Sequence, residues 1–197
     1  MWYILDSEPG AYLYYGFKSD ITKEEYKRSI NNNTITELLN KVEVHKGDVF
    51  FIPAGTVHAI GAGIVICEIQ QNSNTTYRVY DYNRRGKDGK TRPLHIRQAV
   101  EVSDLKKSHG QKPVAEGDNV ILAECKYFTV HRLRVNGTMM LDIDNTSFRS
   151  LIVAEGCGKL RMNSAKLAIK KGDSVFIPAQ NGSYTIEGQC ELILSHV

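Results

Sequence analysis

A turn followed by a strand occurs twice in this chain with the same residues, and it limits the folds that the chain can adopt. Lys-Gly-Asp at 46–48 and Phe-Ile-Pro-Ala at 51–54 recur with the same spacing at 171–173 and 176–179. Glycine gives the backbone freedom to turn and aspartate can bond its own main chain, while proline ends a strand because it has no N–H for the ladder. Such a repeat predicts two related β units.

The first copy of the pattern leads directly to a histidine. Pro53 ends the strand-like run 49–52, and Gly55 allows the backbone to bend again before His58. We therefore expect one imidazole to be displayed just past a rigid corner of the chain.

Two charged residues follow on neighbouring strand-like runs. Glu68 is a carboxylate within the apolar run 64–69, and a third strand-like run brings in Arg78. Burying a carboxylate without a partner costs several kcal/mol, so Glu68 calls for a cation, a metal or a hydrogen-bonded ligand. His58, Glu68 and Arg78 on adjacent short β segments predict one wall of a polar pocket inside a small barrel.

The order of residues at 47–58, Gly-Asp-x4-Pro-x-Gly-x2-His, resembles the second conserved motif of the cupin superfamily. The run CEIQQNSNTTYRVYDYNR at 67–84 is more specific, and together with His-Ala-Ile at 58–60 it is similar to type I phosphomannose isomerase, also called mannose-6-phosphate isomerase. The resemblance covers essentially the whole chain, but only the C-terminal portion of the family's usual length.

The resemblance implies an enzyme that uses zinc and interconverts mannose 6-phosphate and fructose 6-phosphate, by proton transfer between C1 and C2 through an enediol. The family holds its metal with a Gln, two His and a Glu, and the last of these histidines corresponds to His58. Arg78 corresponds to the active-site arginine that steadies charge on the enediol. Glu68 and Arg84 are the candidates for binding the substrate, a hexose 6-phosphate.

The other metal ligands of the family precede the part that is matched here. One histidine cannot hold a catalytic zinc, which ordinarily takes three protein ligands. We therefore expect Met1 to be an internal methionine of a longer ancestral protein and the chain to be inactive alone. Unpaired strand edges would invite an N-terminal complementing segment or self-association through the opened barrel, and Trp2 and Tyr3 are expected to be exposed there.

Each charged candidate has a second interpretation. Glu68 is either a structural salt-bridge partner of Arg78 or a substrate contact, and Arg78 could instead pair with Asp81 or Glu68. The basic, turn-rich stretch 83–93 is either a solvated loop or a loop that faces a phosphate, with Arg84 the residue expected to point inward.

The remaining segments predict an all-β chain with one helical insertion. Thr22 and Glu25 have the spacing of a capping box, and a second short helix is expected near Thr34, so helices occupy about 20–40. Residues 94–102 are compatible with a strand leading to a helical turn or with an edge strand.

Two cupin-like barrel or jelly-roll units follow from this pattern. We expect an incomplete catalytic barrel at 1–102, a linker at the polar stretch 103–119, and a C-terminal cupin-like domain at 120–197. In that domain short strands are separated by turns, including turns near Gly137 and Gly188. The counterpart of His58 in the second copy is Ser183, and a hydroxyl is a poor ligand beside imidazole and carboxylate. The second unit is therefore expected to be structural.

Composition excludes several classes of protein. A net charge of +3, spread among acidic residues, does not indicate a nucleic-acid partner, and a charged content of 24% is ordinary for a globular protein. No apolar run approaches the roughly 20 residues of a membrane span. The four cysteines lack both C-x-x-C spacing and the density of a secreted scaffold, which predicts a cytoplasmic protein.

Two hypotheses about function remain. One is a hexose 6-phosphate isomerase, or the C-terminal portion of one. The other is a non-catalytic double cupin that binds a sugar or a protein partner and has lost its metal site.

Overall fold

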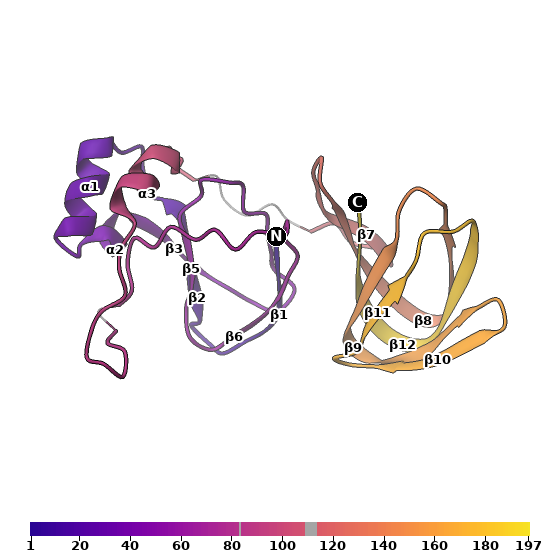
Figure 1. Ribbon diagram of the computed structural model, residues 1–197. Helices are drawn as coiled ribbons and strands as arrows, with labels where there is room; N and C mark the ends of the chain where they lie inside the picture. The colour runs from indigo at the N-terminus through magenta and orange to yellow at the C-terminus, as the bar shows by residue number, and fades with distance from the viewer. Residues whose placement is uncertain (83, 109–113) are drawn as a thin grey trace. The chain divides into compact units, whose positions relative to one another are not determined.

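The computed structural model describes residues 1–82, 84–108 and 114–197. The chain divides into two compact units, one formed by Trp2–Lys112 and the other by Pro113–Val197 together with Met1 (Figure 1). The predicted linker, 103–119, includes residues 109–113, which lie outside the described residues, so the limits of that linker stay a prediction.

The first unit contains two antiparallel sheets of three strands each in its described part. Their strand orders are β4-β1-β6 and β3-β2-β5. Buried apolar side chains from both sheets, among them Ile4, Leu13 and Phe50, form a shared core. The strands are β1 (Trp2–Ser7), β2 (Tyr12–Phe17), β3 (Leu39–Glu43), β4 (Val49–Phe50), β5 (His58–Ile60) and β6 (Ile64–Glu68).

Three helices of the first unit, among the residues described, lie together beside its strands in Figure 1: α1 (Lys23–Asn31), α2 (Ile35–Leu38) and α3 (Ile96–Val102). The predicted capping box is confirmed, because the Thr22 hydroxyl accepts the Glu25 amide at 3.1 Å and the Glu25 carboxylate accepts the Thr22 amide at 2.8 Å. Tyr26 of α1 and Ala99 of α3 pack into one apolar cluster. The stretch 94–102 is therefore mainly helical and contains no edge strand.

The repeated turn has the same geometry in both units. Gly47 and Gly172 have φ values of 93° and 90°, a region that glycine enters without a Cβ penalty. Asp48 and Asp173 each accept the backbone amide three residues earlier, at 2.8 and 2.9 Å. The sequence repeat is therefore a structural repeat, although the strand predicted at 49–52 ends at Phe50.

The second unit is a six-stranded antiparallel sheet in the described part of the chain. Its order is β10-β9-β12-β8-β7, and β11 pairs with β9. Several of these strands are longer than the short strands that we predicted for 120–197. They are β7 (Asn119–Glu124), β8 (Thr129–Ile143), β9 (Arg149–Met162), β10 (Ala165–Lys170), β11 (Ser174–Ile177) and β12 (Gly182–His196).

Glycines inside the long strands explain why the prediction was wrong. Gly137, Gly158 and Gly188 pair with one another across β8, β12 and β9 and do not form the turns that we expected. A Cβ at Gly188 would lie 2.5 Å from the Cys157 carbonyl oxygen, so glycine is needed for the backbones to approach. The strands thus continue through the glycines, and the mainly β class with a helical insertion is confirmed.

No helix within the described ranges is both long and apolar enough to cross a bilayer.

Gly188→Ala should destabilise the second unit more than Gly137→Ala. Both glycines have positive φ, 144° and 105°, so both changes strain the backbone, by about 1–2 kcal/mol. Only the Cβ at position 188 would also collide with backbone, because nothing lies within 4 Å of a Cβ at position 137. Equal unfolding midpoints for the two variants in a urea titration would contradict this account.

Candidate functional site

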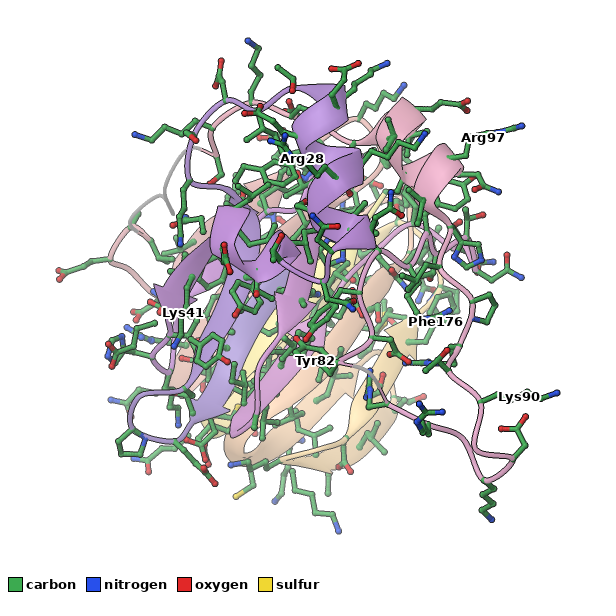
Figure 2. The ribbon with its side chains drawn as sticks, turned by 90° about the vertical axis from the view of Figure 1, so that its left-hand side faces the viewer. Arg28, Lys41, Tyr82, Lys90, Arg97 and Phe176 are labelled. Atoms are coloured by element: carbon green, nitrogen blue, oxygen red, sulfur yellow. The ribbon has the colours of Figure 1, made fainter. Side chains whose placement is uncertain are left out.

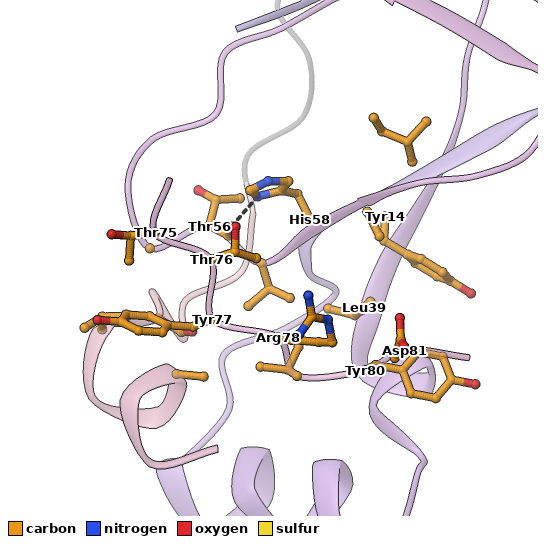
Figure 3. A pocket seen from close by; sticks show the side chains of 18 of the residues that line it. Tyr14, Leu39, Thr56, His58, Thr75, Thr76, Tyr77, Arg78, Tyr80 and Asp81 are labelled. Carbon is orange, nitrogen blue, oxygen red and sulfur yellow. Dashed lines mark hydrogen bonds between the residues drawn. The ribbon is translucent and has the colours of Figure 1, made fainter. Parts of the chain in front are cut away.

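The first unit contains a cavity of about 730 Å³, a size typical of small-molecule sites. Strand β5, the end of β6 and the irregular segment 73–82 supply much of its wall (Figure 3). His58, Glu68, Arg78 and Arg84, the four residues selected from the sequence, all line this cavity. The structure therefore brings them together, and it leaves their chemical roles as predictions.

The His58 ring is exposed at the start of β5, where its backbone pairs with Tyr15 of β2. Its Nδ1 lies 2.8 Å from the Thr56 carbonyl oxygen, as the dashed line in Figure 3 shows. A carbonyl oxygen can only accept, so Nδ1 carries the hydrogen in this contact and Nε2 keeps a lone pair. That leaves Nε2 as the nitrogen able to bind a metal or to accept a proton.

Trp2 connects His58 with Glu68, a link that the sequence did not reveal. The Trp2 indole Nε1 donates to Glu68 Oε1 at 2.9 Å, and the Trp2 and His58 rings meet edge to face with centroids 5.2 Å apart. Glu68 is exposed, so the prediction that this carboxylate is buried, and for that reason needs a cation, a metal or a hydrogen-bonded ligand, was wrong. Trp2 and Tyr3 are only 3% and 2% exposed, because β1 lies between β4 and β6; their predicted exposure was also wrong.

Arg78 lies on irregular backbone, because no strand forms between residues 76 and 82. The backbone N–H and C=O groups of Arg78 both form hydrogen bonds with one residue, His95. The Arg78 amide donates to His95 Nδ1 at 3.0 Å, and the His95 amide donates to the Arg78 carbonyl at 2.8 Å. The predicted third strand was therefore wrong, and His95 was not among the residues selected from the sequence.

The Arg78 side chain is half-buried and extends toward His58 across the cavity (Figure 3). Its Nη1 donates to the Pro93 carbonyl at 3.4 Å. In the part of the chain that the structure describes, no salt bridge joins Arg78 to Glu68 or Asp81, the two partners that the sequence left open. Its charge therefore faces the cavity without a carboxylate against it.

Asp81 instead binds two other arginines. Its carboxylate accepts from Arg84 Nη2 at 2.7 Å and from Arg92 Nε at 2.8 Å, and Arg92 Nη2 makes a further short contact. Asp81 is 6% exposed, and the Arg92 and Arg84 guanidiniums hold its pKa well below the usual range. This carboxylate stays charged at any pH near neutrality.

Phenol groups supply neutral hydrogen-bond donors to the same cavity. Burial raises the pKa of Tyr14 and of Tyr82, so both hydroxyls stay protonated at neutral pH. With Ser73, Thr75 and Thr76 nearby in the wall, the cavity offers hydroxyl groups suited to the hydroxyls of a sugar.

The residues present do not fit a catalytic zinc. Among the described residues no group of three His, Cys, Asp or Glu side chains could hold a metal ion, whereas a catalytic zinc takes three protein ligands. In the second unit Ser183, on β12, provides a hydroxyl at the position equivalent to His58. We therefore assign no chemical step to a metal.

The repeated turn and the antiparallel sheets of both units define a cupin-like protein. Residues 118–197 match the family model described as mannose-6-phosphate isomerase, cupin domain. The whole chain is 37% identical to mannose-6-phosphate isomerase ManA of Bacillus subtilis and 34% identical, over 99% of its length, to the mannose-6-phosphate isomerase of Streptococcus mutans. The chain is therefore similar to mannose-6-phosphate isomerases along its whole length, and residues 118–197 carry the cupin domain of that family.

Solved structures agree with this assignment. A crystal structure of the mannose 6-phosphate isomerase from Bacillus subtilis aligns over 100% of the chain with a TM-score of 0.89 and 34% identity. The apo enzyme from Salmonella typhimurium aligns with a TM-score of 0.75 at 16% identity, which supports the fold alone. The chain spans 63% of the length of ManA and 62% of the Streptococcus mutans relative.

His95→Ala should speed hydrogen exchange of the Arg78 amide about fivefold, because it removes an acceptor worth about 1 kcal/mol. His95→Asn keeps an oxygen acceptor on a side chain of similar reach and should exchange close to the wild-type rate. His45→Ala, at an exposed histidine in a different turn, is the control. Wild-type exchange in His95→Ala would show that the ring does not hold Arg78.

The stability that Asp81 contributes should disappear in acid. Because its folded-state pKa is depressed, the contribution is fully present above the unfolded value of about 3.9 and is lost as the pH falls through the folded value. The difference in unfolding free energy between wild type and Asp81→Asn should therefore be larger at pH 7 than at pH 3. A difference that does not change over this range, measured in urea, would contradict the ion-pair geometry.

Proposed function

We propose that this chain is part of a mannose-6-phosphate isomerase that interconverts mannose 6-phosphate and fructose 6-phosphate through an enediol. The observation that carries the proposal is the cavity of the first unit, where His58, Glu68 and Arg78 meet in a chain 37% identical to a protein named for that activity. A hexose phosphate suits a cavity of about 730 Å³ lined by hydroxyl groups and guanidiniums.

In this proposal Arg78 stabilises the negative charge that develops on the sugar oxygens of the enediol. A charge fixed in place before the reaction needs no reorganisation as the transition state forms. His95 and Pro93 hold Arg78 in that position, and its guanidinium has no carboxylate partner among the described residues. Arg78 is thus the residue that we expect to lower the barrier.

Glu68 is proposed to bind the substrate through its carboxylate. Trp2 donates to Oε1, which fixes the orientation of the group while the side chain remains exposed to the cavity. A carboxylate accepts hydrogen bonds from sugar hydroxyls through both oxygens. Trp2, which donates to this carboxylate, also contacts the His58 ring edge to face.

Zinc dependence belongs to the proposal through the family resemblance, with His58 Nε2 as one ligand. Since the cavity is lined by one imidazole and the described residues hold no cluster of three ligands, the remaining ligands would come from outside the part of the relatives' length that the chain spans. We propose that an N-terminal complementing segment or self-association supplies them, that the chain alone is inactive, and that it acts in the cytoplasm.

A second candidate is a non-catalytic double cupin that binds sugar phosphates. The absence of a three-ligand cluster within the described ranges favours it. The two candidates make the same prediction for binding and opposite predictions for turnover once the site is complete.

The purified chain should hold no stoichiometric zinc and should not turn over mannose 6-phosphate. Fusion of the N-terminal segment of Bacillus subtilis ManA to Met1 should restore both, as measured by metal mass spectrometry and a coupled assay. In the fusion, Arg78→Gln should lower kcat by about a hundredfold or more, the usual cost of removing a donor to developing charge. Arg28→Gln, on α1 outside the cavity, should leave kcat unchanged.

Turnover of mannose 6-phosphate by the chain alone would contradict the proposal that its metal site is incomplete. A fusion that binds zinc and the sugar phosphate without turnover would contradict the isomerase proposal and support the non-catalytic binding protein.

A further inference from the structure

Residues 103–108, which follow α3, run beside the end of β2, and we call this segment the strap. Lys107 forms a parallel bridge with Phe17, and the Ser108 amide donates to the Phe17 carbonyl at 3.0 Å. Leu105 packs against the apolar cluster that contains Phe17. Main-chain hydrogen bonds and apolar packing therefore attach the strap to the first unit.

Asp20 provides a carboxylate that anchors the strap. Its Oδ1 accepts the Lys107 amide at 2.8 Å, and its Oδ2 accepts the Lys106 ammonium group at 2.8 Å. The hydrogen bond from Lys106, followed by that from the Lys107 amide, lowers the pKa of Asp20 below its ordinary value. Asp20 is therefore ionised at neutral pH and binds two consecutive residues of the strap.

Two glycines allow the strap to lie directly against the rest of the first unit. Gly55 has a φ of 90°, and a Cβ there would lie 3.2 Å from the Asp104 amide nitrogen and 2.8 Å from the carbonyl oxygen of Val102, the residue before the strap. Gly16 has a φ of 64°, and a Cβ there would lie 2.6 Å from the Ser108 Cβ. Both ends of the strap thus contact backbone that leaves no room for a side chain.

The loop that presents His58 to the cavity is held on both sides of Thr56. On one side the Gly55 carbonyl accepts the Asp104 amide of the strap at 2.9 Å, and on the other the carbonyl of the next residue accepts an amide of β2 at 2.8 Å. The Thr56 carbonyl oxygen itself lies 2.8 Å from His58 Nδ1 (Figure 3). The position of this oxygen therefore depends on the strap.

A carbonyl held in this position selects one of the two tautomers of the His58 ring. Because the oxygen can only accept, the hydrogen sits on Nδ1 and the lone pair stays on Nε2. If the loop moved away, the hydrogen could occupy either nitrogen, and Nε2 would be a donor in part of the molecules. A segment that only tied the chain down would not affect which nitrogen carries the hydrogen.

We propose that the strap is a positioning element of the candidate site. Anchored by Asp20 and packed on Gly55, it fixes the Thr56 carbonyl and thereby the tautomer of His58 whose Nε2 lone pair is accessible to a ligand. Asp20 is not among the residues that line the cavity, so it acts through Thr56 and does not touch the ligand. That the ligand is a sugar phosphate rests on the proposed function, whereas the tautomer of His58 does not.

Proton–nitrogen correlation spectra of the imidazole rings test this in the isotope-labelled full chain, without ligand and at about pH 8, where histidine is neutral. Wild type should carry the His58 hydrogen on Nδ1, and His58→Gln identifies these signals by their loss. Asp20→Ala should change the ratio of the two tautomers about fivefold, the change that corresponds to one ordinary hydrogen bond. Asp20→Asn keeps an oxygen for the Lys107 amide and should lie between the two.

Gly55→Ala and Gly47→Ala form a matched pair of variants. Their φ values of 90° and 93° mean that a Cβ strains the backbone similarly, but nothing lies within 4 Å of a Cβ at position 47. Gly55→Ala should shift the His58 tautomers as Asp20→Ala does. Gly47→Ala should keep the wild-type tautomer even where its unfolding midpoint falls, and circular dichroism melts confirm that each variant is folded.

Two exposed cations separate the anchor from a general effect of surface charge. Lys106→Gln removes one contact of Asp20 and should shift the tautomers less than Asp20→Ala, because exposed ion pairs contribute little. Arg97→Gln is the control. Arg97 is 89% exposed, points away from the ribbon in Figure 2 and belongs to α3, which directly precedes the strap. This variant should keep the wild-type tautomer.

An unchanged His58 tautomer in folded Asp20→Ala and Gly55→Ala would overturn the positioning role of the strap. The same shift in Gly47→Ala or Arg97→Gln would also overturn it, since neither residue contacts the strap in the structure. Failure of the proposed function has a different signature. In that case mannose 6-phosphate neither binds nor turns over, while the tautomer of His58 still depends on Asp20.

Discussion

The wall of the cavity that carries Arg78 is irregular backbone, and its polar groups must find partners outside a sheet. Buried or half-buried amides and carbonyls are paired in folded proteins because leaving them unpaired costs about as much as a lost hydrogen bond. His95 meets this requirement for Arg78 by accepting its amide and donating to its carbonyl. A few residues further on, Asp81 ties the chain to Arg84 and Arg92. The shape of this wall therefore depends on side-chain contacts that replace strand pairing.

The two units contain the same turn but continue from it into different structures. Asp48 and Asp173 close the same Gly-Asp turn, and the strands that follow pair with β1 and β9. Beyond that point the first unit runs into irregular segments and loops that line a cavity. The second unit instead continues into long hydrogen-bonded strands around an apolar core, with Ser183 on β12 in place of an imidazole. Polar chemistry is thus concentrated in the first unit.

Local chemistry made part of this structure predictable. The capping box at Thr22 and the repeated Gly-Asp turns depend on residues close in sequence, and both were predicted correctly. Gly188 was misread because a glycine that permits close strand approach looks, in sequence, like a glycine in a turn. The Trp2 contact with Glu68 joins residues 66 positions apart, and no local pattern encodes it.

The candidate site shows the same division. The motif at 47–58 selected His58, the apolar run 64–69 selected Glu68, and the family resemblance and the basic stretch selected Arg78 and Arg84. The structure places all four at one cavity. The pairing of Asp81 with two arginines could not be predicted from the sequence. It requires Arg92, 11 positions further along the chain, to contact the same carboxylate.

The central claim is that the cavity of the first unit binds a sugar phosphate and that the second unit does not. Backbone amide chemical shifts of the isotope-labelled chain, titrated with fructose 6-phosphate, test this most directly. The account predicts shifts concentrated in residues 55–60, 73–82 and 84–92, with β7 to β12 unchanged. Shifts concentrated in β8, β9 and β12, or no shifts at millimolar ligand, would contradict it.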